Sequence, residues 1–248
     1  MLCDSQFGFR KNRSTQLALT SYLDKLTEVL DKNEFVVSLF IDLSKAFDTI
    51  DHSLLLQKLY NYGIRGISHD FVKSYLTNRS QYVEIQGGSS NSLSITCGVP
   101  QGSILGPILF LVYINDLCKC TKLLKLFLFA DDTTILFSLK DINELIKVMN
   151  KELEIITDWF KLNKLSLNTA KTNYMIFKPL KNEEKHLDLV LDTKVVERVH
   201  STKFLGVEID DKLSWKNHIQ QIEKKLSSSI YIMRKIRHKI NQNTAFKL

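Results

Sequence analysis

The chain has 248 residues, of which 44% are hydrophobic and 25% are charged, so it can bury a substantial core and is not a disordered polymer. Its net charge of +7 arises beyond residue 210. Residues 1–210 carry 25 basic and 25 acidic side chains, whereas residues 211–248 carry 9 basic and 2 acidic ones. Such a basic tract suggests a polyanionic partner such as nucleic acid, although a solvated helix face explains it equally well.

The cysteines lack the spacing of a zinc site, so reduced thiols in an intracellular protein, in the cytoplasm or the nucleus, are expected. The longest apolar stretch, residues 104–117, is too short to span a bilayer, so no membrane partner is expected. The first ten residues, MLCDSQFGFR, resemble the middle of a patterned segment. We therefore expect the chain to be part of a longer polyprotein.

The first half of the chain alternates between helical and extended patterns. Residues 35–43 are apolar on both faces, as expected of a strand buried on both sides of a sheet. The expected helices are residues 15–30, 52–62 and 68–76. Residues 82–85 and 92–96 flank two glycines and are expected to pair as a hairpin.

The second half begins with a loop, residues 98–106, and a helix that runs to about residue 117 with Pro107 in an early turn. Strands 123–130 and 133–139 enclose Asp131 and Asp132, and Asp141 is the expected N-cap of a long amphipathic helix, 141–162. Further strands are expected at 173–177, 187–191, 194–199 and 204–209, followed by a basic helix or helix pair at 215–240. This mixture predicts an α+β (mixed α/β) domain.

The strongest chemical signal is a set of acidic residues at strand ends. Asp42 closes one apolar strand, and Asp131 and Asp132 form the tip of an apolar hairpin. Burying an unpaired carboxylate costs several kcal/mol, and no Lys or Arg neighbours the pair, so a divalent ion such as Mg²⁺ or Mn²⁺ is the expected partner. Two such ions about 4 Å apart promote phosphoryl transfer. An isolated Asp-Asp pair is more often a simple turn, so the interpretation depends on the accompanying motifs.

These motifs resemble those of reverse transcriptases of the non-LTR (LINE-type) retrotransposon branch. FADD at 129–132 is similar to the family's catalytic acidic box, and FIDLSKAFD at 40–48 to its other acidic motif. GVPQGSILGP at 98–107 resembles the loop that contacts template and substrate. The other matches are QFGFR at 6–10 with Ser14 and Thr15, LSLN at 165–168 with Lys171 and Thr172, and FLGV at 204–207.

The resemblance implies a right-hand polymerase palm at residues 35–210, with an antiparallel sheet backed by helices. Residues 1–34 would be part of the fingers, and residues 211–248 the start of a helical thumb. The implied activity is that of an RNA-directed DNA polymerase that extends a DNA primer with dNTPs on an RNA template, using two Mg²⁺ or Mn²⁺ ions. The fingers motifs that grip the triphosphate would precede residue 1, so we expect weak or no activity from this chain alone.

The resemblance also implies roles for single residues. Asp42, Asp131 and Asp132 would hold the metal ions, with the carbonyl of Leu43 as an extra ligand. Phe47 would lie under the sugar of the incoming nucleotide and exclude a 2′-hydroxyl group. Without the motif, an ordinary core phenylalanine would be the expected interpretation of Phe47.

Other implied contacts involve substrate and nucleic acid. Gln101 and Gly102 would approach the nascent base pair, and Lys171 would protonate or neutralise the pyrophosphate, although a surface lysine fits equally well. Leu205 and Gly206 would hold the primer 3′ end. Residues that would contact template or duplex phosphates are Arg10, Lys224, Lys225 and Arg234, with a solvated basic turn as the alternative for Arg10.

Three other interpretations compete with this one. A truncated relic could bind nucleic acid through its basic C-terminal segment without catalysis. A group II intron maturase shares the palm, but the segment 6–10 fits the retrotransposon branch better. An RNA-dependent RNA polymerase is disfavoured by Phe47. Asp48 and Asp51 are expected to cap the following helix and not to bind metal.

Overall fold

The computed structural model describes residues 2–177 and 188–236. Its contacts divide the chain into two compact units, Met1–Val199 and His200–Leu248. The larger unit contains the sheet and most of the helices, and the smaller one contains a hairpin and one helix. Each unit is described by itself.

The first unit is built on a five-stranded sheet with the strand order β13-β10-β1-β8-β7. Its strands are β1 (Phe35–Ile41), β7 (Lys125–Phe129), β8 (Asp132–Leu139), β10 (Asn173–Phe177) and β13 (Glu197–Arg198). All neighbouring strands are antiparallel except β10 and β13. The apolar strand β1 lies in the centre, as its sequence predicts, because a central strand is covered on both faces.

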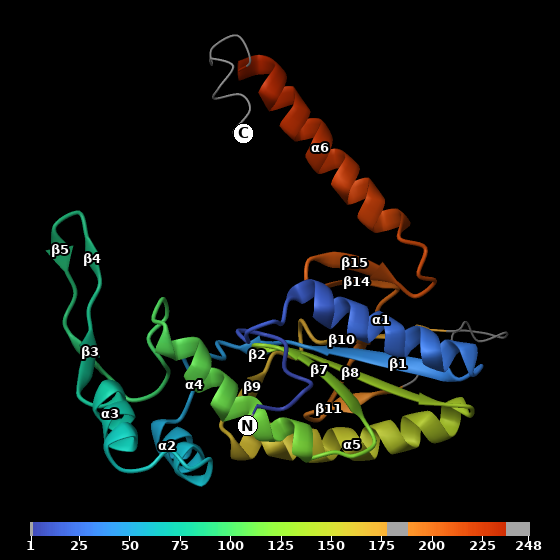
Figure 1. The fold of residues 1–248 in the computed structure, drawn as a ribbon. Coiled ribbons are helices and arrows are strands. Elements are labelled where there is room, and N and C mark those ends of the chain that lie inside the picture. Colours follow the sequence, from blue (N-terminus) through green and yellow to red (C-terminus); the bar gives the residue numbers. More distant parts are fainter. Residues whose placement is uncertain (1, 178–187, 237–248) are drawn as a thin grey trace. The chain divides into compact units, whose positions relative to one another are not determined.

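Helices cover both faces of this sheet, with α1 (Thr15–Asp31) on one side and α5 (Ile142–Leu162) on the other (Figure 1). On the α1 side, the ring of Tyr22 packs edge-on against Phe127, with centroids 5.5 Å apart. The Tyr22 hydroxyl donates a hydrogen bond of 2.8 Å to Oγ of Ser38. This bond satisfies a polar group that is buried in the centre of β1.

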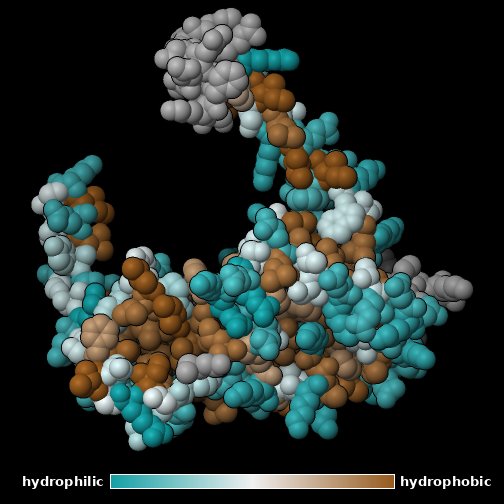
Figure 2. Space-filling model, in the orientation of Figure 1, coloured by the Kyte–Doolittle hydropathy of each residue, from teal (hydrophilic) through white to brown (hydrophobic). Residues whose placement is uncertain are grey.

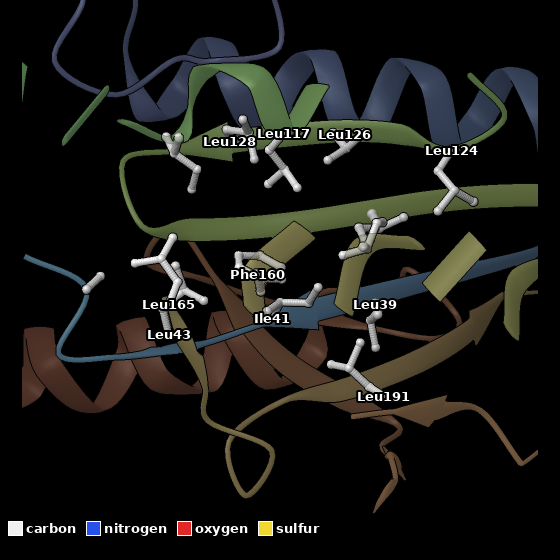
Figure 3. Close-up of a cluster of buried hydrophobic side chains, with 14 of the residues drawn as sticks. Leu39, Ile41, Leu43, Leu117, Leu124, Leu126, Leu128, Phe160, Leu165 and Leu191 are labelled. Atoms are coloured by element: carbon white, nitrogen blue, oxygen red, sulfur yellow. The ribbon is translucent and has the colours of Figure 1, made fainter. Parts of the chain in front are cut away.

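The main core fills the space between the sheet and α5 (Figure 3). Side chains alternate along a strand, so Leu39 and Ile41 face α5 while Ser38 faces α1. Phe160 of α5 is completely buried against them. Each such side chain contributes roughly 1.5–3 kcal/mol to folding. The end of β1 is packed in this core, and Asp42 follows it directly.

Shorter elements surround the sheet. The helices are α2 (His52–Asn61), α3 (Ile67–Leu76) and α4 (Leu105–Ile114), followed by the 3₁₀ turn η1 (Asn115–Lys119). Two short strand pairs are β2 (Leu43–Ser44) with β9 (Ser166–Leu167), and β11 (Val190–Leu191) with β12 (Lys194–Val195). The strand expected at 194–199 is wrong as one element, because it divides into β12 and β13. Residue 187 of the strand expected at 187–191 lies outside the described residues.

The expected hairpin near residue 87 forms, but with different strands. It consists of β3 (Arg79–Gln81) paired with β6 (Leu93–Ile95), and β4 (Glu84–Ile85) paired with β5 (Gly88–Ser89). Its strands are exposed except for Ile95, which is partly buried. Without a buried face the apolar pattern does not fix strand boundaries, which explains the difference.

The second unit contains the hairpin of β14 (Ser201–Phe204) and β15 (Val207–Asp210), followed by α6 (Lys216–Ile236). The prediction of one strand over 204–209 is wrong. Leu205 and Gly206 have φ angles of 47° and 91° and form a two-residue turn between Phe204 and Val207. Apolar and hydrophilic side chains both line α6 (Figure 2), and the expected helix beyond 236 lies outside the described residues.

The helices of the described part of the chain include none that is both long and apolar enough to cross a membrane.

Asp51 caps α2, as expected from the sequence, and its removal should produce a pH-dependent loss of stability. Its carboxylate accepts a hydrogen bond from the Leu54 amide and pairs with Lys164 at 2.6 Å, and these contacts lower the Asp51 pKa to about 2. Because the folded-state pKa is depressed, the stabilisation is present above about pH 4 and is lost as the pH falls through about 2.

We therefore expect Asp51→Ala to lower the free energy of unfolding by about 1 kcal/mol at neutral pH. Urea denaturation at neutral pH and near pH 2 measures this difference, which should largely vanish at the lower pH. An equal loss at both pH values would contradict the assignment.

Candidate active site

The strand register brings the three predicted carboxylates to one edge of the sheet. Ile41 of β1 pairs with Thr133 of β8 in antiparallel register, so Asp42 follows β1 directly beside Asp132. Phe129 pairs with Asp132, which leaves Ala130 and Asp131 as a two-residue turn. Residues about ninety positions apart in the chain thus meet at one sheet edge.

The pKa values of Asp131 and Asp132 reflect both their burial and their proximity to other carboxylates. Burial raises the pKa of Asp131, and the negative charge of Asp42 raises it further. Desolvation by the surrounding protein raises the pKa of Asp132, and the charges of Asp131 and Asp42 raise it further. The raised pKa values mean that burial and charge repulsion both disfavour the ionised forms of these two carboxyl groups. A cation would relieve this repulsion, and hard carboxylate oxygens suit a divalent ion.

The carboxylate of Asp42 is held by the segment that follows α5. Its Oδ2 accepts a hydrogen bond of 2.8 Å from Nδ2 of Asn168, and its backbone carbonyl accepts one of 2.9 Å from the Asn168 amide. The Asp42 amide donates to Oγ1 of Thr172 at 3.3 Å. The adjoining β2–β9 pair, with Leu43 opposite Leu167, fixes this arrangement. Asn168 and Thr172 are therefore site residues whose function was not assigned from the sequence, although both lie in a recognised motif.

In residues 2–177 and 188–236, no three His, Cys, Asp or Glu side chains converge as a ready-made metal cluster. Asp42 instead directs one oxygen toward Asn168. The acidic side chains are neighbours through strand pairing and electrostatic interaction, and their oxygens do not point at a common centre.

The loop at residues 98–101 packs directly against the end of the first acidic motif. The amide of Val99 donates to the carbonyl of Phe47 at 2.9 Å, and the Gly98 amide donates to that of Ile50 at 2.8 Å. Gly98 has a φ of +84°, and an added Cβ would lie 2.7 Å from the Asp48 carbonyl oxygen. Only glycine permits this close approach with this backbone angle.

Phe47 is half-buried beside this loop, with its ring 4.6 Å from that of Phe110 and tilted by 31°. Gln101 is exposed and donates a hydrogen bond of 2.8 Å to Asp48. Asp48 therefore does not cap α2 as expected, because its carboxylate is engaged by the loop. Gly102 is exposed with a φ of +81°, and a cavity of about 760 Å³ lies between this loop and β3.

Two predicted contact residues have different surroundings. Lys171 is exposed and precedes Thr172, which places it close to the Asp42 strand end. Nη1 of Arg10 donates to the carbonyls of Cys3 and Gln6 at 2.7 and 3.0 Å. This nitrogen of Arg10 therefore stabilises the N-terminal segment.

The remaining predicted residues lie in the second unit. Leu205 and Gly206 occupy the β14–β15 turn, where a leucine with a φ of 47° is an unfavourable conformation. Lys224, Lys225 and Arg234 are exposed on α6.

Solved structures of other proteins share the fold of this chain. Telomerase from Candida albicans, in complex with a fragment of telomeric RNA, superposes with a TM-score of 0.56 over 84% of this chain and 34% of that one, at 13% identity. Apo telomerase from Candida tropicalis gives 0.55 over 86% of this chain. At this identity the match shows the fold alone, which is the polymerase palm, with an antiparallel sheet backed by helices.

A family model described as reverse transcriptase (RNA-dependent DNA polymerase) matches residues 1–209. The chain belongs to the reverse transcriptase family. Two relatives from Drosophila melanogaster are the probable RNA-directed DNA polymerase from transposon BS, 28% identical over 234 residues, and that of the mobile element jockey, 27% identical over 232.

These matches cover 89% and 91% of this chain and 25% of each relative, so the chain spans about a quarter of their length. The resemblance to non-LTR retrotransposon enzymes is thereby confirmed. Enzymes of this family generally use divalent metal ions.

Proposed function

We propose that this chain provides the catalytic palm of an RNA-directed DNA polymerase, which extends a DNA primer with dNTPs on an RNA template. The observation that carries the proposal is the pairing of Ile41 with Thr133, which places Asp42 beside Asp132 and the Asp131 turn. Family membership and the names of the relatives point to the same activity.

Asp42, Asp131 and Asp132 would hold two Mg²⁺ or Mn²⁺ ions, with the Leu43 carbonyl as a further ligand. The donor set fits, because these are hard oxygen ligands, and burial together with the neighbouring negative charges raises the pKa values of Asp131 and Asp132. The ions would supply positive charge at the attacking and leaving oxygens. Asn168 would hold one oxygen of the Asp42 carboxylate, so that the other oxygen could serve as the metal ligand.

The other residues would position the substrates. Phe47 would contact the sugar of the incoming nucleotide, and Gln101 with Gly102 the nascent base pair. Lys171 would neutralise the departing pyrophosphate. For the nucleic acid, the turn at Leu205 and Gly206 would hold the primer end, and further phosphate contacts would come from Lys224, Lys225, Arg234 and the free donors of Arg10. Residues 1–34 would belong to the fingers, and residues from 211 onward to the thumb.

Primer extension on an RNA template tests the proposal. We expect primer extension that needs Mg²⁺ or Mn²⁺ and prefers dNTPs. The extension should be weak with the chain alone and robust with any longer product of the same reading frame. Nucleic-acid binding without metal-dependent extension by either protein would favour a non-catalytic relic and contradict the proposal.

Asn168→Ala should reduce extension because the variant removes the side-chain donor that orients Asp42. Supporting contacts of metal ligands typically contribute 10- to 100-fold, so we expect a loss of about tenfold. The apparent metal affinity should fall with the rate, and extra Mn²⁺ should restore part of the activity. Asn173→Ala, which removes a side-chain amide at the start of β10 that donates to the Lys171 carbonyl at 3.1 Å, is the matched control. Equal effects of the two substitutions would argue against an orienting role for Asn168.

A further inference from the structure

The N-terminal segment lies along the outer edge of the strand that leads into the acidic turn. β7 is the edge strand of the five-stranded sheet, and residues 5–8 run parallel to it. The Phe7 amide donates to the Leu128 carbonyl at 2.7 Å, and the Leu128 amide donates to that of Ser5 at 2.8 Å. The backbone of this segment is thus fixed close to residues 129–132.

Gln6 contacts the acidic turn from this position. Its side chain is buried, with 1% of its surface exposed. Its Oε1 accepts two hydrogen bonds, one of 3.0 Å from the Ala130 amide and one of 2.8 Å from the Gly8 amide. Both donors are backbone groups, so together they fix the orientation of the Gln6 amide and its distance from the turn.

Ala130 needs such a contact because its backbone conformation is unfavourable. It has a φ of +55°, a region that non-glycine residues rarely adopt, and it is the first residue of the turn that carries Asp131. Its amide is buried, so it would remain unsatisfied without Gln6. The bond to Gln6 therefore helps to hold the turn in this conformation.

Gly8 provides the room for this contact. An added Cβ would lie 2.3 Å from the Ala130 nitrogen and 3.0 Å from the Phe129 carbonyl carbon. Both are backbone atoms, so no side-chain rotation can relieve the overlap. Any other residue at position 8 would push the N-terminal segment and the acidic turn apart.

We propose that Gln6 and Gly8 are positioning residues that hold the Ala130–Asp131 turn, and with it the metal-binding carboxylates, through the hydrogen bond from the Ala130 amide. The expected effect on metal binding rests on the proposed function, whereas the contact of Gln6 and Gly8 with the turn rests only on the hydrogen bonds and distances given above. The QFGFR segment would then have a structural role at the acidic turn in addition to any contact with the template.

The test uses Gln6→Met, which keeps the length of the side chain and removes the acceptor. Amide hydrogen exchange at Ala130, measured by NMR on the 248-residue chain, should be about tenfold faster, while the Val37 and Ile135 amides in the sheet core stay protected. Mn²⁺ titration, followed through broadening of the Asp131 and Asp132 signals, should show about tenfold weaker binding. Gln16→Met, on the exposed surface of α1, is the control.

Gly8→Ala should weaken Mn²⁺ binding at least as much as Gln6→Met does. Gly88→Ala should leave it unchanged, since a Cβ added there would lie at an ordinary 3.5 Å from its nearest neighbour, the Ile85 carbonyl oxygen. Unchanged exchange at Ala130 in Gln6→Met would overturn the inference, as would faster exchange with unchanged Mn²⁺ affinity. If the wild-type chain itself does not bind Mn²⁺ at these residues, the proposed function fails, and the exchange measurement alone decides whether Gln6 holds the turn.

Discussion

Asp131→Asn is expected to abolish metal-dependent primer extension, with a loss of more than about a hundredfold, because even residues that only support a metal ligand contribute 10- to 100-fold. The substitution keeps the shape of the side chain and removes its charge. Asp131 lies in the turn beside Asp132, and both burial and the Asp42 charge raise its pKa, so these groups share one electrostatic environment. Removing one charge therefore weakens the attraction for a divalent ion directly.

The measurement is extension of a DNA primer on an RNA template, with wild type and variant at several Mg²⁺ concentrations. Nucleic-acid binding should remain unchanged, since basic groups elsewhere in the chain provide it. Asp70→Asn on α3 is the matched control, because this side chain is 77% exposed. Retention of extension by Asp131→Asn, with a loss in the control, would exclude the carboxylate assignment.

The second large effect is expected from Phe47→Val, which should allow ribonucleotides to be incorporated. The half-buried ring packs on Phe110, and the Val99 amide bonds to its backbone carbonyl, so Phe47 has little freedom to move aside for a 2′-hydroxyl group. Replacing the ring by an isopropyl group opens this space. Steric selection of this size is worth about 10- to 200-fold in discrimination.

The relevant quantity is the ratio of kcat/KM for a dNTP to that for the matching ribonucleotide. A general loss of stability lowers both values and leaves the ratio unchanged, so the ratio separates selection from destabilisation. Phe71→Val serves as the control, since Phe71 is 59% exposed on α3. An unchanged ratio in Phe47→Val would show that Phe47 is an ordinary core residue.

Patterns within single segments predicted most of the first unit. The helices α1, α2 and α5 and the strands β1, β8 and β10 lie within one or two residues of their expected bounds, since each has a buried face and a consistent period. Prediction failed where burial is low or a turn lacks polar residues. The exposed hairpin of β3 to β6 has different strands from those expected, and the turn at Leu205 and Gly206 divides an apolar stretch that was expected to be one strand.

For the site, the sequence by itself determined the acidic residues, their position at strand ends and the family motifs around them. These features are local, because an Asp next to an apolar run is visible without knowing its neighbours. Only the tertiary structure decided that Asn168 orients Asp42, that Asp48 is bound by Gln101, and that Gln6 reaches Ala130 across 124 positions. Hydrogen bonds between distant segments depend on strand register and side-chain direction, which no local pattern specifies.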